Sequence, residues 1–418
     1  MRIPSLVVLA TLATATPGSA AAVGHDLAAV RAYKADYADG RASTTVAGLI
    51  PAWARKYNMN CSGCHYPVPP RLNATGLRFR WAGYRMPEEI NEAITVEKIQ
   101  NYVAGHAVTQ FEWTKTSGQP ADNVFALPEA GLFFAGPFGR HFAGFLEFQR
   151  TPDGAVDLGA SMQAMWGQEQ RYGGFRVGQI HAINEWGVAG FDRKVGADDI
   201  APLGTITAAI PFTFDMAVGA EAFLVTGSNR LSMQLTNGID VAGGVTPGGP
   251  GPSKDVALID QLLYDGEGSG IEAVGYYGTL KGIDSVAQPT LNSHFWRLAL
   301  SANKIYHNTE VLAGVVYGKD LDLPTSLAFT NNEDTGLGWW VSGQYYMPNT
   351  PLVLFARYEM VTPNTDVSNS GTRYVDAGLV LPVNLPQYIR TTLEYRLTNP
   401  ESGAPNTSDV LAELQFNF

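Results

Sequence analysis

The feature that most constrains the fold is a period-two alternation of apolar and polar residues that recurs through most of the chain. In residues 102–113, for example, Phe111 and Trp113 fall on one face and Gln110 and Glu112 on the other. This period places successive side chains on opposite sides of a strand. Strands with apolar residues facing out and polar residues facing in are typical of membrane β-barrels.

The number of such segments indicates the size of the barrel. About sixteen or seventeen can be counted between residues 102 and 418, with turn-rich sequence between them, and because bacterial single-chain barrels have an even number of strands, sixteen are predicted. Residues 410–418 alternate in the same way and end on Phe418, a pattern that resembles the terminal assembly signal of outer-membrane barrels. A soluble β-sandwich is the alternative, but it seldom needs so many strands in one run.

Charged residues on the polar face make the predicted lumen hydrophilic, as a channel or a plugged pore requires. Each is expected to be a solvated side chain: Glu112, Glu147, Glu221, Arg297, Arg357, Glu359, Glu394 and Glu413. Residues 241–252 and 319–335 are expected to form longer extracellular loops. Asp320, Asp322, Glu333 and Asp334 make the second loop acidic, so it is either simply solvated or able to concentrate a metal cation near the outer mouth.

A second strong signal precedes the strands, at Cys61-Ser62-Gly63-Cys64-His65. Two cysteines three residues apart, followed at once by histidine, form the attachment motif of c-type haem, in which each thiol adds to a vinyl group and His65 is the proximal iron ligand. A four-cysteine zinc site would need a second pair of cysteines, but the chain has only two. A thioredoxin-like dithiol would need a surrounding βαβ pattern, which is not found. One covalent haem c is therefore predicted.

The residues around the motif indicate a small helical module over residues 51–100. Residues 51–60 are expected to form a helix whose aromatic side chains cover one face of the porphyrin, and the proline-rich stretch 66–70 cannot continue it. A helix face is expected around residues 72–79, and a second short helix over residues 87–100. The module is small for an independent domain.

The sixth iron ligand is open to several candidates. Met86 is preferred because it lies 21 residues beyond the motif, within the same module, and methionine ligation would raise the reduction potential above that of a second histidine. A packing role is the alternative for Met86. Met59 lies too close in sequence to reach the far side easily, and His106 could serve if the first strand passes the haem.

The N-terminus indicates export. Residues 1–22 combine Arg2, a short apolar core and a small-residue cleavage zone, which together are typical of a secretory signal peptide. Residues 23–50 are expected to be a periplasmic lead-in. No later stretch offers about 18 consecutive apolar residues, so a transmembrane helix is not expected. Loss of Arg2 with the signal changes the formal net charge from −11 to −12, a balance that disfavours binding to nucleic acid.

Taken together, the signal peptide, the single haem motif and the barrel over residues 101–418 resemble the fused outer-membrane cytochrome-porins of iron-oxidising bacteria. The residues that carry the local resemblance are Trp53, Ala54, Arg55, Met59, Cys61, Cys64, His65, Pro70, Arg71, Leu72, Asn73, Gly76, Phe79, Gly83 and Tyr84. The resemblance implies electron transfer across the outer membrane, with extracellular Fe(II) as the leading donor, and therefore an Fe(II) oxidase activity. The barrel itself carries no motif specific to a reaction.

The expected mechanism places the module in the barrel lumen as a plug, its N-terminus starting in the periplasm and the barrel in contact with outer-membrane lipid. The haem would be reduced from outside and oxidised by a periplasmic c-type cytochrome, so that insoluble ferric product stays outside. Two alternatives are open. One is a porin or channel whose haem plug is purely structural, and the other is an electron conduit for a different donor or acceptor, including one that works in the opposite direction.

Overall fold

The computed structural model describes most of the chain from residue 52 onward. The described residues are 52–57, 59, 63–65, 72–93, 98–150, 156–181, 196–210, 212–214, 216–237, 254–281, 292–327, 329–348, 350, 352–382 and 389–417. The predicted signal peptide (1–22), the lead-in (23–50), Cys61 and the loop at 241–252 lie outside them.

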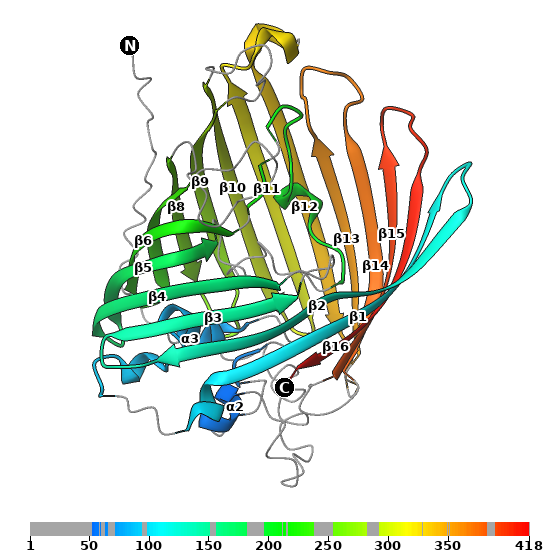
Figure 1. Cartoon of the computed structure of the whole chain (residues 1–418). Coiled ribbons are helices and arrows are strands. Elements are labelled where there is room, and N and C mark those ends of the chain that lie inside the picture. Colours follow the sequence, from blue (N-terminus) through cyan, green and yellow to red (C-terminus); the bar gives the residue numbers. More distant parts are fainter. Residues whose placement is uncertain are drawn as a thin grey trace.

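The strands close into one barrel, which confirms the predicted architecture and the predicted number of strands. Sixteen are formed by the described residues (Figure 1), namely β1 (Val103–Thr116), β2 (Ala121–Pro137), β3 (Phe142–Arg150), β4 (Val156–Gln168), β5 (Arg171–His181), β6 (Met216–Thr226), β7 (Asn229–Asn237), β8 (Lys254–Leu263), β9 (Gly270–Lys281), β10 (Asn292–Tyr306), β11 (Thr309–Leu321), β12 (Asp334–Tyr346), β13 (Val353–Thr362), β14 (Thr372–Pro382), β15 (Ile389–Pro400) and β16 (Thr407–Asn417).

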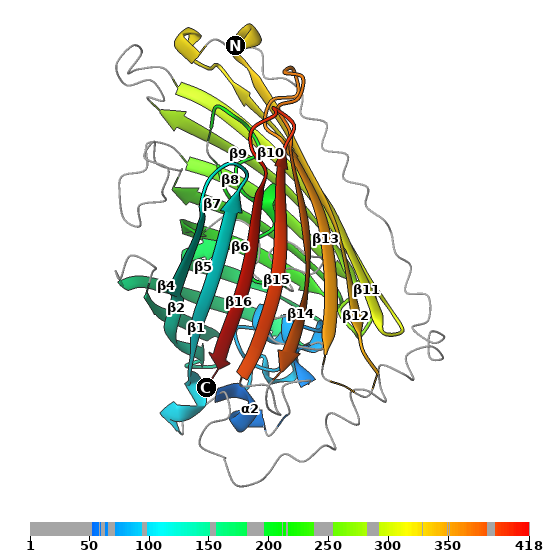
Figure 2. The same ribbon diagram turned by 90° about the vertical axis from the view of Figure 1, so that its right-hand side faces the viewer.

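Each strand pairs antiparallel with its neighbours in sequence, and β16 closes the barrel against β1, beside which it lies in Figure 2. In the closing register Gln110 lies opposite Glu413, and Trp113 lies opposite Val410. Closure leaves no strand edge with unpaired backbone groups, which a bilayer would not tolerate. The predicted terminal strand is therefore an integral part of the barrel wall.

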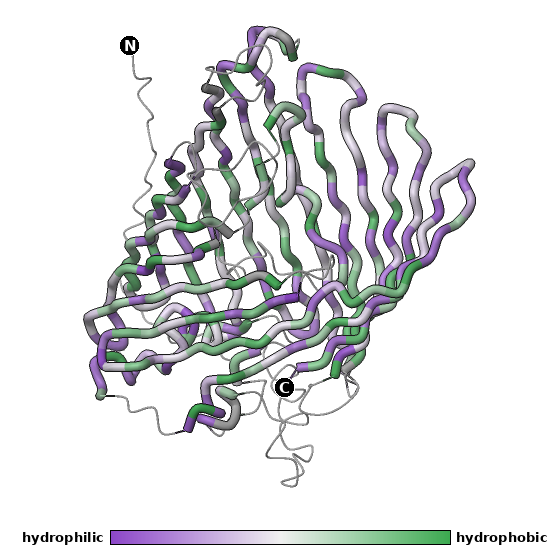
Figure 3. Tube along the Cα trace, viewed as in Figure 1, coloured by the Kyte–Doolittle hydropathy of each residue, from purple (hydrophilic) through white to green (hydrophobic). Residues whose placement is uncertain are grey.

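The alternation read from the sequence corresponds to the two faces of this wall. On β7, Leu231, Met233 and Leu235 are exposed on the outside, while Ser232 and Gln234 are buried on the inside. The alternating colours along the strands in Figure 3 show the same pattern. An apolar outer surface suits contact with lipid. In the described part of the chain, no helix is both long and apolar enough to cross a membrane.

The connections between strands differ at the two ends of the barrel. Two-residue turns at 169–170, 227–228 and 307–308 lie at the end where β1 begins and β16 finishes. The longer connections, such as 182–215 and 322–333, lie at the other end. The second of these is shorter than the predicted loop at 319–335, because β11 continues to Leu321 and β12 begins at Asp334.

The N-terminal region forms short helices near the turn-rich end of the barrel (Figure 1): α2 (Ala52–Tyr57), α3 (Ala74–Trp81), η2 (Pro87–Glu89) and η3 (Ile99–Tyr102). The predicted helices before the motif and after the proline-rich turn are confirmed in shortened form. The predicted helix over residues 87–100 is wrong where the chain is described there. Its first turn forms, but Asn91 adopts a left-handed backbone conformation (φ +74°) and its side chain donates to the Gly167 carbonyl near the end of β4.

Two segments pack against the inner face of the barrel, on different parts of it. Residues 72–93 pack against β4–β8, where Leu77 and Trp81 share a buried cluster with Met165 and Tyr172. Residues 196–214, which include η4 (Ala201–Leu203), pack mainly against β8–β15 and bury an apolar core around Phe212. The lumen is therefore occupied by parts of the chain itself.

Candidate functional site

The described part of the haem motif is Gly63, Cys64 and His65, and all three are half-buried. The Cys64 thiol is free, and burial raises its pKa to about 11. A free thiol followed directly by a histidine is the pair of residues that covalent attachment of haem c uses at the end of its motif. Cys61, the other predicted attachment residue, lies outside the described residues.

Asn73 ties this motif to α3. Its backbone N–H donates to the Cys64 carbonyl (2.9 Å), and its side-chain Nδ2 donates to the Gly63 carbonyl (3.2 Å). Its Oδ1 accepts from the Gly76 N–H (3.0 Å), which makes Asn73 the N-cap of the helix. A single buried side chain therefore fixes the start of α3 and the backbone just before the predicted proximal ligand.

Gly76 allows this contact to be close. A Cβ atom at Gly76 would lie 2.2 Å from the Cys64 carbonyl oxygen, far inside van der Waals distance. Leu72, one residue before Asn73, forms an isolated antiparallel bridge with His65. The motif therefore lies directly on the first turn of α3. This packing gives Leu72, Asn73 and Gly76, three of the residues that carry the sequence resemblance, a structural role.

α3 is in turn attached to the barrel wall. Leu77 and Trp81 are almost fully buried against the β4–β8 side of the lumen. The Trp81 carbonyl accepts from Gln163 Nε2 of β4 (2.9 Å). Arg78 Nη2 donates to the Ser228 hydroxyl in the β6–β7 turn (2.9 Å). The position of the motif relative to the barrel is thus set by both apolar packing and hydrogen bonds.

The turn after α3 forms a second attachment, to β2–β4. Gly83 has a positive φ (+70°), and a Cβ atom there would lie 2.7 Å from both Ala143 Cβ and Met165 Cε. Tyr84 stacks on Phe145 of β3 at 5.7 Å between ring centroids. The fully buried Arg85 donates to the Arg140 and Phe142 carbonyls at 2.9 and 2.8 Å. We call residues 83–85 the docking turn.

The helix before the motif, α2, is attached to the same place. Trp53 stacks on Tyr84 (5.3 Å between centroids, 14° between planes) and donates through Nε1 to the Ala135 carbonyl of β2 (3.3 Å). The Tyr57 hydroxyl donates to Glu89 Oε2 (2.6 Å). Burial, followed by the Glu89 hydrogen bond, raises the pKa of Tyr57 well above its usual range. The aromatic residues of α2 therefore gather around the docking turn and Phe79, and their covering of a porphyrin face stays a prediction.

The candidates for the distal iron ligand occupy different surroundings. Met86 is half-buried, and its backbone N–H donates to Glu89 Oε2 (2.9 Å). His106 lies on the inner face of β1, with Nε2 2.6 Å from Glu129 Oε1 and its ring 4.8 Å from that of Phe133. Met59 packs its methyl group against Gly63. Ligation of iron by Met86 stays a prediction.

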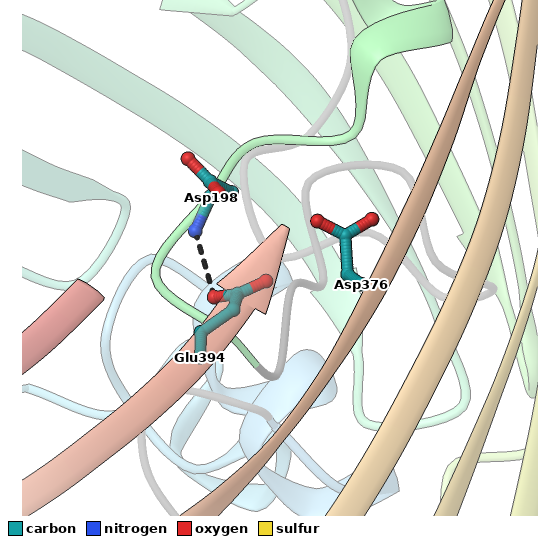
Figure 4. A group of neighbouring side chains, drawn as sticks. All are labelled: Asp198, Asp376 and Glu394. Carbon is teal, nitrogen blue, oxygen red and sulfur yellow. Dashed lines mark hydrogen bonds between the residues drawn. The ribbon is translucent and has the colours of Figure 1, made fainter. Parts of the chain in front are cut away.

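The inner face also carries a cluster of three acidic residues, one of which, Glu394, was expected to be a solvated lumen side chain. Asp198, Asp376 and Glu394 each offer a ligand atom, and these atoms lie within 4.8 Å of one another. Figure 4 shows Asp198 donating its backbone N–H to Glu394. Arg357 and Arg396 lie 3.4 Å from the two oxygens of Asp376. The prediction of solvated side chains is wrong here, because residues 196–201 cover these groups and the arginines pair with them.

The acidic residues at the ends of β11 and β12 were expected to lie in an outer loop, and this is also wrong. Asp320 and Asp334 are buried on the inner face. Asp334 Oδ2 accepts from the Ala208 and Ala209 N–H groups at 2.6 and 3.0 Å, and Asp320 Oδ2 accepts from the Ile210 N–H at 3.0 Å. These two carboxylates therefore bind the backbone of residues 196–214, which we call the inward segment. They do not form a metal-cation site at the outer mouth of the barrel.

Sequence reasoning missed the inward segment itself. It belongs to the connection 182–215, which is long for a barrel loop and carries bulky apolar residues where a solvated loop would not need them, namely Ile200, Ile206, Ile210, Phe212 and Phe214. Long connections inside a compact domain are commonly functional or packed. The combination of length and apolar content was the signal that could have placed this segment in the lumen.

Comparison with solved structures supports the barrel alone. The chain is similar to the loop-deleted OmpT of Vibrio cholerae (13% identity, covering 76% of this chain and 99% of that chain, TM-score 0.52) and to the channel DcaP of Acinetobacter baumannii (12%, 76% and 96%, 0.53). It is also similar to OmpF of Salmonella typhi (13%, 76% and 97%, 0.50). No protein-family model and no curated protein sequence matches the chain. The fold is therefore that of the porin-like outer-membrane barrels.

Proposed function

We propose that this porin-like barrel is an outer-membrane electron conduit, in which a monohaem c-type cytochrome module over residues 51–100 is held as a plug in the lumen. The observation that carries the proposal is the chain of contacts from the motif through α3 to the wall. Gly63 and Cys64 are bonded to Asn73, and α3 and the docking turn are bonded to β2–β4 and to the β6–β7 turn. A free solute channel would not need this attachment.

The residues of the chain have distinct parts in such a conduit. Cys61 and Cys64 would hold the haem covalently, His65 would ligate the iron, and Met86 would supply the sixth ligand. When bound, the haem supplies one-electron transfer at a potential that its axial ligands and surroundings tune. Asn73 and Gly76 orient the motif, and the buried aromatic residues exclude water from it.

The proposed direction is from extracellular Fe(II), or another reductant, to a periplasmic c-type cytochrome. Support comes from the sequence resemblance and from the position of the N-terminal helices near the turn-rich end, where β1 begins and β16 finishes. In barrels of this kind the short turns are periplasmic and the long loops extracellular. A partner in the periplasm would then meet the side on which the motif sits.

The test begins with the full chain purified from outer membranes in detergent. Covalent haem is measured by its absorption after denaturation, the reduction potential by spectroelectrochemical titration, and the rate of reduction by stopped-flow addition of Fe(II). In liposomes that contain an oxidised soluble cytochrome c, Fe(II) added outside should reduce the enclosed protein. The Cys61→Ser/Cys64→Ser variant, which cannot attach haem, is the control. Absence of covalent haem in the wild type would overturn the proposal.

A second candidate is a porin whose plug is purely structural. The observation that favours it is the fold, which is shared with the DcaP channel and with OmpF. Planar-bilayer recordings separate the two candidates. Steady ion conductance, together with a haem that no external donor reduces, would support the porin, whereas electron transfer across liposomes without comparable conductance would support the conduit.

A further inference from the structure

The inner face of the barrel carries a cluster of arginines with too few carboxylates to neutralise it. Arg176 of β5 and Arg230 of β7 flank one acid, Glu221 of β6, and Arg78 of α3, like Arg230, lies within electrostatic reach of Tyr172 of β5. Arg230 Nη2 lies 2.7 Å from Glu221 Oε1, and Arg176 Nε lies 3.5 Å from Glu221 Oε2. Three positive charges and one negative charge leave an excess of two, in a place where Glu221 and Arg230 are each only 2% exposed.

Two other arginines of the lumen each have a carboxylate partner of their own. Arg297 is paired with Asp320, and Arg390 is paired with Glu413. Arg78, by contrast, reaches only a neutral hydroxyl, that of Ser228, among the side chains described. Arg230 is paired with Glu221, whereas Arg78 and Arg176 are partly exposed and bring positive charge that Glu221 does not balance. Such an excess of positive charge attracts an anion.

Unused hydrogen-bond donors lie in the same place. The Tyr172 hydroxyl is buried (2% exposed) and has no acceptor within the part of the chain that the structure describes. It lies within electrostatic reach of Arg230 and Arg78. Trp81 Nε1, in the same packed cluster, and Nε of Arg78 also lack acceptors there. Buried polar groups are normally satisfied, so an anion bound between these donors would supply the acceptors that the described residues do not.

We infer that Arg78, Arg176, Arg230 and Tyr172 form a binding site for a carboxylate group between α3 and strands β5–β7. A carboxylate accepts several charge-assisted hydrogen bonds at once and supplies the missing negative charge. Arg78 and Arg176 are partly exposed, which gives such a group access from the lumen.

Two sources could supply the carboxylate. One is a propionate of the haem, in which case the inference rests on the proposed function, and α3 would bind both the motif and the edge of the porphyrin. The other is a diffusible carboxylate that enters the lumen. The chemistry of recognition is the same, so the two must be separated by experiment.

The experiment uses the full chain in detergent and compares Arg78→Gln and Tyr172→Phe with the wild type. The matched control is Arg373→Gln, since Arg373 pairs with Glu401 at the far end of the barrel. For the diffusible source, citrate is titrated by calorimetry. For the haem source, the propionate bands are followed by resonance Raman spectroscopy, and citrate is titrated into the haem-free Cys61→Ser/Cys64→Ser variant.

Binding of citrate to the wild type that weakens by about tenfold or more in Arg78→Gln, and by about 2- to 10-fold in Tyr172→Phe, would establish the site with a diffusible ligand. If the propionate bands shift in both variants and citrate binds only to the haem-free protein, the site is established with a haem propionate as its carboxylate. Tyr172→Phe is the more discriminating variant. If the Tyr172 hydroxyl binds no carboxylate, its removal should leave citrate binding and the propionate bands unchanged. Citrate binding and propionate bands that are the same in wild type, Arg78→Gln and Tyr172→Phe would overturn the inference. Absence of covalent haem in the wild type would refute the proposed function but leave the citrate arm valid.

Discussion

Replacing Asn73 by alanine tests whether the haem motif is held on α3 as described. The change removes the hydrogen bond from Nδ2 to the Gly63 carbonyl and the N-cap bond from Gly76 to Oδ1, but it leaves the backbone bond to Cys64. Asn73 is only 4% exposed, so water cannot fully replace what is lost. The first turn of α3 and the motif should therefore separate more often.

The size of the effect follows from the two bonds. Loss of an N-cap costs about 0.5–2 kcal/mol, and loss of one further hydrogen bond costs about 0.5–1.5 kcal/mol. Together they should lower the free energy of local opening by about 1–3.5 kcal/mol, which corresponds to opening about 5- to 400-fold more often. Asn73→Ser keeps a capping oxygen and loses only the bond to Gly63, so its effect should be about 2- to 12-fold.

Hydrogen exchange of the peptide covering residues 72–93 measures this opening directly. We expect exchange to be fastest in Asn73→Ala, intermediate in Asn73→Ser and slowest in the wild type. Asn123→Ala, at an exposed position on β2, is the control and should exchange like the wild type in this peptide. If Asn73→Ala exchanged at the wild-type rate, the attachment of the motif to α3 would be wrong.

Four further changes test other parts of the lumen. Gly83→Val should undock the turn, because its φ is positive and its Cβ would meet Ala143, and tryptic cleavage after Arg85 should accelerate by about tenfold or more; unchanged cleavage would contradict this. Met86→Ala should abolish a methionine–iron charge-transfer band, whereas a retained band would exclude Met86 as ligand. Glu394→Gln should loosen residues 197 and 198 and raise their hydrogen exchange, since Glu394 accepts from both of their N–H groups; exchange equal to that of the wild type would refute this attachment. Burial raises the pKa of Asp198, with Arg396 opposing it, so Asp198 should favour docking of residues 196–210 at acidic pH and lose this contribution as pH rises through its raised pKa. In hydrogen exchange corrected for intrinsic rates, Asp198→Asn should show a smaller pH dependence than the wild type, and an unaltered profile would count against this role.

The sequence predicted those features that depend on local pattern. Alternation such as Phe111 against Glu112 places each strand and its two faces without any knowledge of its partners, because the period of a strand is a local property. The even strand number and the terminal strand follow from barrel closure. The haem-attachment motif is also a local pattern, since it lies within five consecutive residues, and the haem that it predicts stays a prediction.

What the sequence could not supply was long-range pairing. The helix expected over residues 87–100 fails at Asn91, whose side chain is bound to the Gly167 carbonyl near the end of β4. Asp334 resembles a solvated loop residue until the backbone of Ala208, more than a hundred positions away, is placed against it. Such contacts leave no periodic signature, so neither the inward segment nor the arginine cluster was visible in the pattern.

The apolar core of the inward segment bears on how the lumen can work. Moving residues 196–214 away from the wall would expose Ile206, Ile210 and Phe212, which are at most 2% exposed. At about 1.5–3 kcal/mol for each side chain, the displacement would cost about 4.5–9 kcal/mol, and the displaced state would be populated less than about once in a thousand molecules. The segment is therefore a fixed part of the lumen wall, as α3 is on the other side. Because both the inward segment and α3 are fixed to the wall, their movement is poorly suited to gating the lumen in the way that a solute channel would need. This favours a lumen that positions a bound group over one that opens for solutes.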